Sequence, residues 1–368
     1  KYNIGLTHMD DESIMIGSGF MRNNLNAKIN GQIAKGLTFD LTARYSYTSV
    51  IGAGTSTEGG SSVARLKHAV RYMPTAGISE MLPEGDDYLE EMLVSNSAEF
   101  LNPVDMTNDE YKKSVRQRQT YNAALNWEII KGLTFRSEWG IELYDEKNDT
   151  FYGLATSNAR KNNLAPLAMK EKKDSYQWRI ANTMTYANTF AEKHDLTVMV
   201  GQEVVSSVSN SLKVEARYFP KSTTREVALA NMDLGTPRPI STSVGTPNNM
   251  ASFFGRVNYS FDDRYILTAS LRADGSSKFA PGNQWGYFPS AAVAWRISQE
   301  EFMKSSEEWL SNLKLRFSFG ASGNNRISND LYRYVYSVSS PPKMYGINGV
   351  EQAIMTPSSA LPNPELKW

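Results

Sequence analysis

The sequence predicts an all-β fold: an antiparallel transmembrane β-barrel, to which this chain contributes about eleven strands. Three observations predict it. Apolar and polar residues alternate with period two over runs of about ten residues, short turns alternate with long irregular connections, and aromatic residues gather near the ends of the runs. Because successive side chains of a strand point to opposite faces, each run has one apolar and one polar face.

The composition excludes several classes of function. The 368 residues include 39 Lys and Arg, 39 Asp and Glu, and no cysteine. Without cysteine there are no disulfides, thiolate metal sites or thiol nucleophiles, and a formal net charge of zero argues against a nucleic-acid partner. The mean hydropathy of -0.45 is typical of a soluble protein, but a barrel that averages a lipid face with polar surfaces reaches similar values.

The clearest strand covers residues 37–47, where Leu37, Phe39 and Leu41 share one phase and Asp40 lies on the other. The same alternation returns, strongly in the first three and more weakly in the others, at 133–143, 265–273, 313–321, 24–33, 121–129, 176–186, 251–261 and 287–297. Tilted strands that cross a membrane need about 9–11 residues, whereas strands of globular proteins mostly have about five or six. The length of the runs therefore favours membrane-spanning strands.

The connections between these runs are of two kinds. Lys35–Phe39 recurs in sequence as Lys131–Phe135, and a glycine between two alternating runs predicts a tight hairpin turn. Short connections are also expected at 192–195 and 262–264, and long, irregular ones at 51–117, 154–173, 219–249 and 322–365. Outer-membrane barrels combine short periplasmic turns with long extracellular loops, so this rhythm favours a barrel.

One connection is predicted to contain a helix. Residues 300–310 place Phe302, Met303, Trp309 and Leu310 at roughly helical spacing, after a capping residue at Ser298. We interpret this segment as an amphipathic insertion that replaces one of the short turns.

A soluble β-sandwich is the alternative architecture, because its strands also alternate and direct their apolar face into a core. Aromatic residues on the apolar phase favour the barrel, since they lie near strand ends as interfacial girdles do: Phe39, Tyr45, Tyr47, Phe135, Tyr259, Phe261 and Tyr265. Mid-strand charges and amides on the polar phase suit a water-filled or plug-filled lumen: Asn24, Asn26, Lys28, Asn30, Asp40, Arg44, Arg136, Glu138, Arg179, Arg256, Arg272 and Arg316.

A more specific signal lies in residues 251–326. This stretch includes Gly-Arg-Val-Asn-Tyr-Ser-Phe-Asp-Asp-Arg-Tyr at 255–265, Trp-Gly-Tyr-Phe-Pro-Ser at 285–290 and Gly-Ala-Ser-Gly-Asn-Asn at 320–325. It closely resembles the barrel of the SusC/RagA-type TonB-linked (TonB-dependent) outer-membrane transporters of Bacteroidetes. Gly17–Phe20 with Arg22, and the ending Leu-Pro-Asn-Pro-Glu-Leu-Lys-Trp at 361–368, are similar to that family too.

The resemblance implies a barrel of 22 strands in a Gram-negative outer membrane, plugged by an N-terminal domain. Such a barrel imports oligosaccharides or peptides with energy from TonB and the proton gradient of the inner membrane. The implied partners are a SusD-like lipoprotein on the extracellular side, TonB through a segment outside this chain, outer-membrane lipid and the glycan or peptide substrate. About eleven strands are recognised in the sequence, whereas a plug domain and a TonB box are not. We therefore expect residues 1–368 to be an internal part of one barrel domain.

The sequence predicts neither an enzyme nor a catalytic, cofactor or metal site. It lacks the G-x-S-x-G, H-E-x-x-H and phosphate-loop motifs, and its three histidines, His8, His68 and His194, are dispersed. A barrel-type enzyme, which would need a clustered Ser/His/Asp set, is therefore improbable. The acidic residues around 84–91 suit a solvated loop better than a cation site, and Asp274–Ser277 is expected to be a structural turn at the rim.

Substrate contacts are expected in the long loops and the lumen, but no individual residue is assigned to them. Several loop aromatics offer surfaces for sugar rings, although loop packing or contact with a lid protein explains each of them as well: Tyr72, Tyr88, Phe100, Tyr152, Tyr218, Phe219, Tyr334, Tyr336 and Tyr345. The functional alternative to a transporter is a soluble or surface-exposed all-β ligand-binding protein without transport activity.

Overall fold

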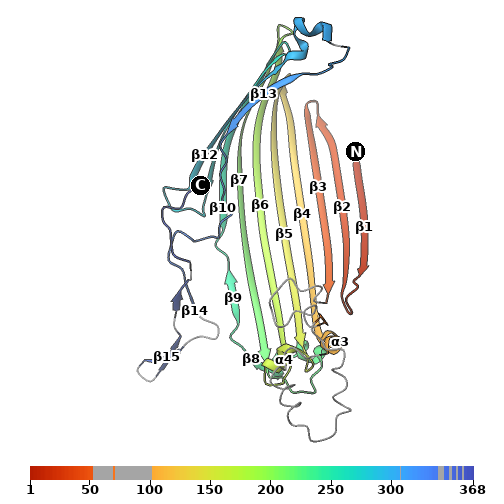
Figure 1. The fold of residues 1–368 in the computed structure, drawn as a ribbon, viewed down its shortest axis with the longest axis vertical. Helices are drawn as coiled ribbons and strands as arrows, with labels where there is room; N and C mark the ends of the chain where they lie inside the picture. Colours follow the sequence, from red (N-terminus) through yellow and green to blue (C-terminus); the bar gives the residue numbers. More distant parts are fainter. Residues whose placement is uncertain are drawn as a thin grey trace.

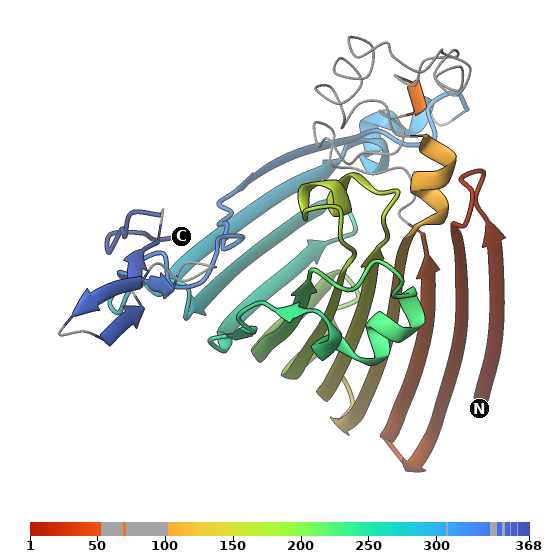
Figure 2. The same cartoon turned by 90° about the horizontal axis from the view of Figure 1, so that it is seen from below.

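One large antiparallel sheet dominates the computed structural model (Figures 1 and 2). The structure describes residues 1–52, 69–70, 102–306, 308–338, 344–347, 350–353, 355–358 and 360–368. Thirteen strands form the sheet, and eleven of them lie side by side in one path. That path is β1 (Tyr2–Glu12), β2 (Gly19–Ala34), β3 (Leu37–Ile51), β4 (Glu110–Ile130), β5 (Leu133–Tyr152), β6 (Leu167–Phe190), β7 (His194–Arg217), β10 (Asn248–Phe261), β11 (Tyr265–Ser276), β12 (Trp285–Arg296) and β13 (Lys314–Gly320).

The predicted all-β antiparallel fold is therefore confirmed. Each predicted alternating run either lies within one of these strands or overlaps it. The described part of the sheet is open, because the path ends at β1 on one side and at β13 on the other. Consecutive strands pair along almost their full lengths, as in the unbroken β6–β7 register from Ala168–Ala216 to Phe190–His194. Such register fixes which side chains share a face.

The central strands are longer than the sequence analysis predicted. β4 has 21 residues, β5 has 20, and β6 and β7 have 24 each. Residues 110–117 and 167–173, expected in loops, are in fact strand. Beyond Leu143, the positions of β5 that continue the apolar phase are occupied by Asp145, Lys147 and Asp149. Both faces of the strand are polar there, so the alternation of apolar and polar residues disappears although the strand pairing continues.

The four predicted short turns lie at one end of the sheet, the upper end in Figure 1. The two Lys-Gly hairpins are confirmed: Gly36 and Gly132 have φ angles of 77° and 84°, a conformation that glycine adopts without strain. Both hairpins also have a register shift in the strand before the glycine, between Gln32 and Ala34 in one and between Glu128 and Ile130 in the other. The sequence echo thus encodes the same bulged hairpin twice.

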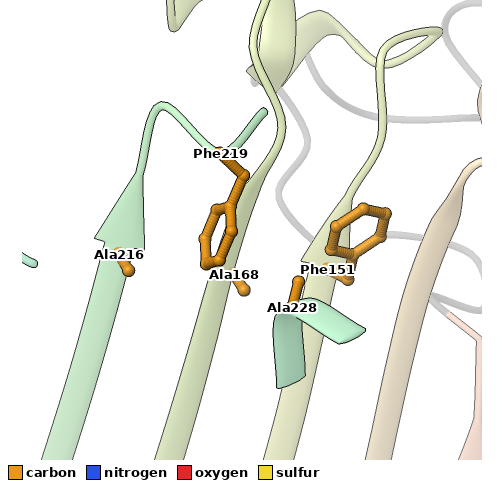
Figure 3. Close-up of a cluster of buried hydrophobic side chains, with 5 residues drawn as sticks. All are labelled: Phe151, Ala168, Ala216, Phe219 and Ala228. Atoms are coloured by element: carbon orange, nitrogen blue, oxygen red, sulfur yellow. The ribbon is translucent and has the colours of Figure 1, made fainter. Parts of the chain in front are cut away.

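Small elements occupy the opposite end, where the long connections lie. They are α3 (Pro103–Asn108), α4 (Ser157–Lys161), α5 (Arg225–Ala230) and η2 (Met232–Leu234), with β8 (Thr236–Pro237) and β9 (Ser241–Val244) pairing with the end of β7. The connection 219–249, expected to be irregular, thus has local structure. A small core fixes it to the sheet, because Phe219 and Ala228 pack on Phe151, Ala168 and Ala216 (Figure 3).

The predicted helix at 300–310 is instead two short 3₁₀ turns, η3 (Ile297–Gln299) and η4 (Glu301–Ser306). Ser298 does not cap a helix, because it lies within η3. Glu300, which is only 9% exposed, ties the segment to the neighbouring strand ends. It accepts hydrogen bonds from Tyr265 Oη at 2.7 Å, Trp295 Nε1 at 2.9 Å and Arg264 Nη1 at 3.0 Å. The backbone at Glu300 is extended, with φ -78° and ψ 148°, and separates the two 3₁₀ turns.

The C-terminal part contains two two-stranded antiparallel sheets, β14 (Tyr336–Val338) with β17 (Met355–Pro357) and β15 (Met344–Ile347) with β16 (Val350–Ala353). This is another local structure within a connection that was expected to be irregular. In the described residues, no helix has both the length and the apolar character required to cross a bilayer.

Candidate functional site

The sheet has two chemically different faces along the same strands. On the apolar face, defined by the phase of Leu41 and Trp139, a hollow of about 380 Å³ is lined by residues such as Ile29, Leu41 and Ile141. On the polar face, defined by the phase of Asp40 and Glu138, a hollow of about 260 Å³ is lined by charged and amide side chains. Trp139 and Ile141 are 43% and 42% exposed, so no layer of the described residues covers the apolar face at these positions.

A row of charged residues crosses the polar face from β3 to β11. We call it the charged row, and it consists of Asp40, Arg136, Glu138, Arg179, Glu203, Arg272 and Asp274. Acidic and basic members alternate along it, so four carboxylates enclose three guanidinium groups. Long-range pairing brings these residues together, because they come from five strands spread over more than two hundred residues of sequence.

Each arginine of the charged row bridges two carboxylates. Arg136 lies 3.8 Å from Asp40 and also pairs with Glu138. Arg179 Nη1 lies 3.2 Å from Glu138 and its Nε donates to Glu203. Arg272 continues the row, with Nη2 3.4 Å from Glu203 and Nε 2.7 Å from Asp274. Every guanidinium group of the charged row is thus paired on both sides, and the row as a whole has one more carboxylate than guanidinium.

Neutral polar groups complete this network. Asn126 donates to Asp40 at 3.2 Å, and Arg272 Nη2 donates to Ser252 Oγ at 2.9 Å. A second cluster lies nearer the long connections, where Glu146 accepts from Arg116 Nε at 3.0 Å, Tyr144 Oη at 3.0 Å and Ser114 Oγ at 3.2 Å. Partly exposed pairs of this kind stabilise a protein modestly but position their side chains firmly because each has several partners.

The comparison with known families decides what kind of sheet this is. The family model described as "TonB dependent receptor-like, beta-barrel" matches residues 83–368, well over half of the chain. The chain belongs to this TonB-dependent receptor barrel family. Its resemblance to the SusC/RagA type is thereby confirmed, and the open sheet is a piece of a TonB-dependent barrel fold.

Curated relatives agree with this assignment. TonB-dependent receptor P26 of Formosa agariphila is 27% identical over 377 aligned residues, which cover all of this chain and 35% of the relative. TonB-dependent receptor SusC of Bacteroides thetaiotaomicron is 39% identical over 128 residues, or 34% of this chain and 12% of the relative. The chain therefore spans about a third of the length of the curated relatives that it matches over its full extent.

A solved structure extends the likeness to the fold. The structure titled "Structure of the RagAB peptide transporter" superposes with a TM-score of 0.76 at 18% identity, over all of this chain and 39% of that one. A second RagAB structure, titled as the peptide importer in the 'closed-closed' state, gives a TM-score of 0.70 at the same identity. At this identity the similarity shows the fold alone.

In this TonB-dependent barrel, the structure brings together only some of the polar residues predicted to share a face. Asp40, Arg136, Glu138, Arg179 and Arg272 join the charged row, and Lys28 lines the hollow beside it. The others lie elsewhere on this face, namely Asn24, Asn26, Asn30, Arg44, Arg256 and Arg316. Asn24 donates to Thr7 and Arg256 to Asn258, but neither belongs to the row.

Sequence reasoning missed two acidic members of the charged row. Glu203 lies in β7, where residues of both phases include polar side chains, so the alternation that would have identified this strand is weak. Asp274 was assigned to an Asp-Gly turn. That prediction is wrong: Asp274 and Gly275 are paired residues of β11, opposite Ser252 and Ala251 of β10. The salt bridge from Arg272 holds Asp274 in the strand.

The predicted aromatic residues fall into two groups. The aromatic residues expected in interfacial girdles lie on the apolar face of β3, β5, β10 and β11. Near the 262–264 turn, Phe261 stacks on Tyr265, and the Tyr259 hydroxyl is hydrogen-bonded to His194. Among the loop candidates, Phe219 is buried in the small core, Tyr152 ends β5, and Tyr218, Tyr334 and Tyr336 are exposed. Tyr345 lies in β15, and the remaining three, Tyr72, Tyr88 and Phe100, lie outside the described residues.

The other predicted features carry less information. The acidic segment around 84–91 and His68 lie outside the described residues. His8 is hydrogen-bonded to Asn23 at 2.6 Å and lies far along the sheet from His194, in β7. Within the part of the chain that the structure describes, no group of three or more His, Asp or Glu residues is arranged to hold a metal ion.

Proposed function

We propose that residues 1–368 form an internal part of one transmembrane barrel domain of about 22 strands, located in the outer membrane of a Bacteroidetes-like Gram-negative bacterium. In this proposal the apolar face contacts lipid and the polar face, with its charged row, lines the lumen. The observation that carries it is the combination of an uncovered apolar face and an internally paired polar face on the same strands. Outer-membrane barrels have this two-faced pattern.

We further propose that the barrel is an importer of oligosaccharides or peptides and not an enzyme. TonB energises it through a segment outside residues 1–368, where the plug domain and the other strands also lie. Two relatives support this reading, one named TonB-dependent receptor SusC and one titled a peptide transporter. The end with the long connections then faces outward and meets a SusD-like lipoprotein, and the short turns face the periplasm.

Uptake by the full-length protein in its own bacterium tests this function. Labelled oligosaccharides and labelled peptides are supplied to the wild type and to a strain that lacks the SusD-like lipoprotein, each with and without a protonophore. We expect uptake of one of the two substrate classes, its loss with the protonophore, and its reduction without the lipoprotein. Uptake that ignores the proton gradient, or release of the full-length protein from membranes without detergent, would contradict the proposal.

A further inference from the structure

A pocket of about 430 Å³ lies at the loop end of the sheet, between the ends of β4 and β5 and residues 221–226. Its volume is within the range of sites for small ligands, about 300–1,000 Å³. Part of its lining is apolar and consists of Tyr111, Phe151, Leu154 and Pro166. Polar side chains, including Asn108, Asp109, Lys221 and Arg225, supply most of the remaining lining.

The pocket lies on the side of the sheet away from the charged row. Tyr111 pairs with Phe151, and Phe151 pairs with Ala168. Phe151 has the same parity as Trp139 in β5, whose register with β6 has no shift between them, so both belong to the apolar face. From Leu143, where the apolar band ends, to Phe151 is about 25 Å along the strand at the usual rise per residue. The pocket is therefore outside the lumen and beyond the membrane band.

The walls of the pocket are held in place without a ligand. Phe219 and Ala228 anchor the segment that contains 221–226 through the small core of Figure 3. On the other side, Asp109 Oδ2 accepts from the Ala155 amide at 2.7 Å, and the Asp109 carbonyl accepts from the Gly153 amide at 2.8 Å. A pocket built on such fixed groups loses little entropy when a ligand binds.

The charges of the pocket cancel. Arg225 donates to Glu226 and lies 5.0 Å from the ring centroid of Tyr111. The hydrogen bond from Arg225 lowers the pKa of Glu226, so both groups are ionised at neutral pH. Asp109 contributes one negative charge and Lys221 one positive charge. A formally neutral pocket with many donors and acceptors favours an uncharged ligand that carries many hydroxyl groups over an anion or a cation.

We propose that this pocket binds a neutral saccharide, with the apolar face of a sugar ring against Tyr111 and Leu154 and its hydroxyls on Asn108, Lys221 and Arg225. Sugars suit such a site because they combine C–H faces, which pack on apolar and aromatic groups, with hydroxyls at their edges. The site goes beyond the proposed import function and depends on it only for placing this end outside the cell. A free oligosaccharide and the sugar chain of a surface lipid share the required chemistry.

Binding measurements on the purified full-length protein in detergent test the proposal. The probes are an array of neutral oligosaccharides and, separately, the sugar chains released from the surface lipid of the producing bacterium; calorimetry then measures the affinity of any probe that binds. Tyr111→Ala removes the aromatic surface, and the milder Lys221→Ala removes one exposed donor. Lys193→Ala, at a short turn on the opposite end, is the matched control.

We expect at least one neutral saccharide to bind, with an affinity that falls about tenfold or more in Tyr111→Ala, a few-fold in Lys221→Ala and not at all in Lys193→Ala. Binding of array sugars identifies free oligosaccharides as the source, and binding of released chains alone identifies the surface lipid. No binding of any saccharide, equal binding by all variants, or competition by peptides alone overturns the proposal. Since none of these readouts involves import, a failure of the transport function would be recognised separately.

Discussion

Arg179 is the central residue of the charged row, because it links Glu138 on one side with Glu203 on the other. Its replacement by glutamine leaves two neighbouring carboxylates with one fewer cationic partner. The side chain is 42% exposed, so solvent screens part of the loss, and we expect Arg179→Gln to lower the free energy of unfolding by about 1 kcal/mol. Denaturant titration of the full-length protein in lipid vesicles measures it.

Arg256→Gln is the matched control for that measurement. Arg256 also lies on the polar face, and its Nε donates to the neutral Asn258 at 3.2 Å. We expect this change to alter stability by less than about 0.5 kcal/mol. If both variants lose the same free energy of unfolding, the ion pairs of the charged row contribute no more stability than any arginine on the polar face.

Glu300 gives a prediction of pH dependence at the short-turn end. Hydrogen bonds from Tyr265, Trp295 and Arg264 lower the pKa of its carboxyl group. Because the pKa is lower in the folded chain, the ionised group contributes stability that is complete above the ordinary glutamate pKa and is lost as the pH falls through the lowered value. We therefore expect the 297–306 segment to loosen in acid, which hydrogen exchange of its amides records.

Glu300→Gln should produce the same loosening at neutral pH, because the amide cannot replace the charge that Arg264 requires. The adjacent Glu301→Gln is the control, since Glu301 is almost fully exposed and lies 3.9 Å from Lys304. Protection of residues 297–306 should fall in the first variant and stay unchanged in the second. If both variants, or neither, lose protection, Glu300 does not hold this segment.

At the scale of elements, the short turns support one another through the backbone. The Gly36 carbonyl accepts from Glu128 of β4 at 2.7 Å, and the Gly132 carbonyl accepts from Ala187 of β6 at 2.8 Å. The next turns repeat the arrangement, with Lys193 accepting from Asp262 at 2.7 Å. An alanine Cβ at Gly132 would lie 2.5 Å from the Ala187 carbonyl oxygen, so this close approach and the positive φ both require glycine.

The two faces of β11 predict opposite responses to the same substitution. Leu267 is 41% exposed on the apolar face, and an arginine at the middle of a lipid-facing strand costs about 2–4 kcal/mol. Thr268, its neighbour, lies on the polar face and donates to Asn258 at 3.0 Å. In a folding titration into lipid vesicles, we expect Leu267→Arg to lose that amount and Thr268→Arg to lose much less. Equal losses would refute the assignment of faces.

Sequence patterns predicted elements best where one face is apolar. Residues 37–47 and 265–273 lie within β3 and β11, and the Lys-Gly echo identified two hairpins that share even their bulges. Prediction was worst where both faces are polar, as at the loop ends of β5 and β6. The prediction of a helix at 300–310 was also wrong, because its apolar spacing did not reveal that Glu300 binds side chains of β11, β12 and the turn between β10 and β11.

At the scale of the whole molecule, the balance of 39 basic and 39 acidic residues has a structural counterpart. Much of this charge is paired across strands, both in the charged row and around Glu146. Mild hydropathy follows from the same architecture, because an uncovered apolar face is averaged with a charged face and polar strand ends. Composition alone therefore resembles that of a soluble protein.

The charged row shows which information the sequence lacked. Its arginines could be placed on a polar face from alternation alone, but their partners depend on register between strands that are distant in sequence, such as Arg272 and Glu203. The loop-end pocket is further from prediction, since it combines residues around 109, 153 and 223 through tertiary packing. Alternation gives the face of a residue, whereas only the register gives its neighbours.

The central claim is that the apolar face contacts lipid and the polar face contacts water, and site-directed spin labelling tests it most directly. This chain has no cysteine, so single cysteines at 267 to 272 of the full-length protein can be labelled in vesicles, provided that any cysteine elsewhere is first replaced. We predict that labels at 267, 269 and 271 are relaxed mainly by oxygen, and those at 268, 270 and 272 by a water-soluble nickel reagent. The same accessibility at odd and even positions would contradict the account.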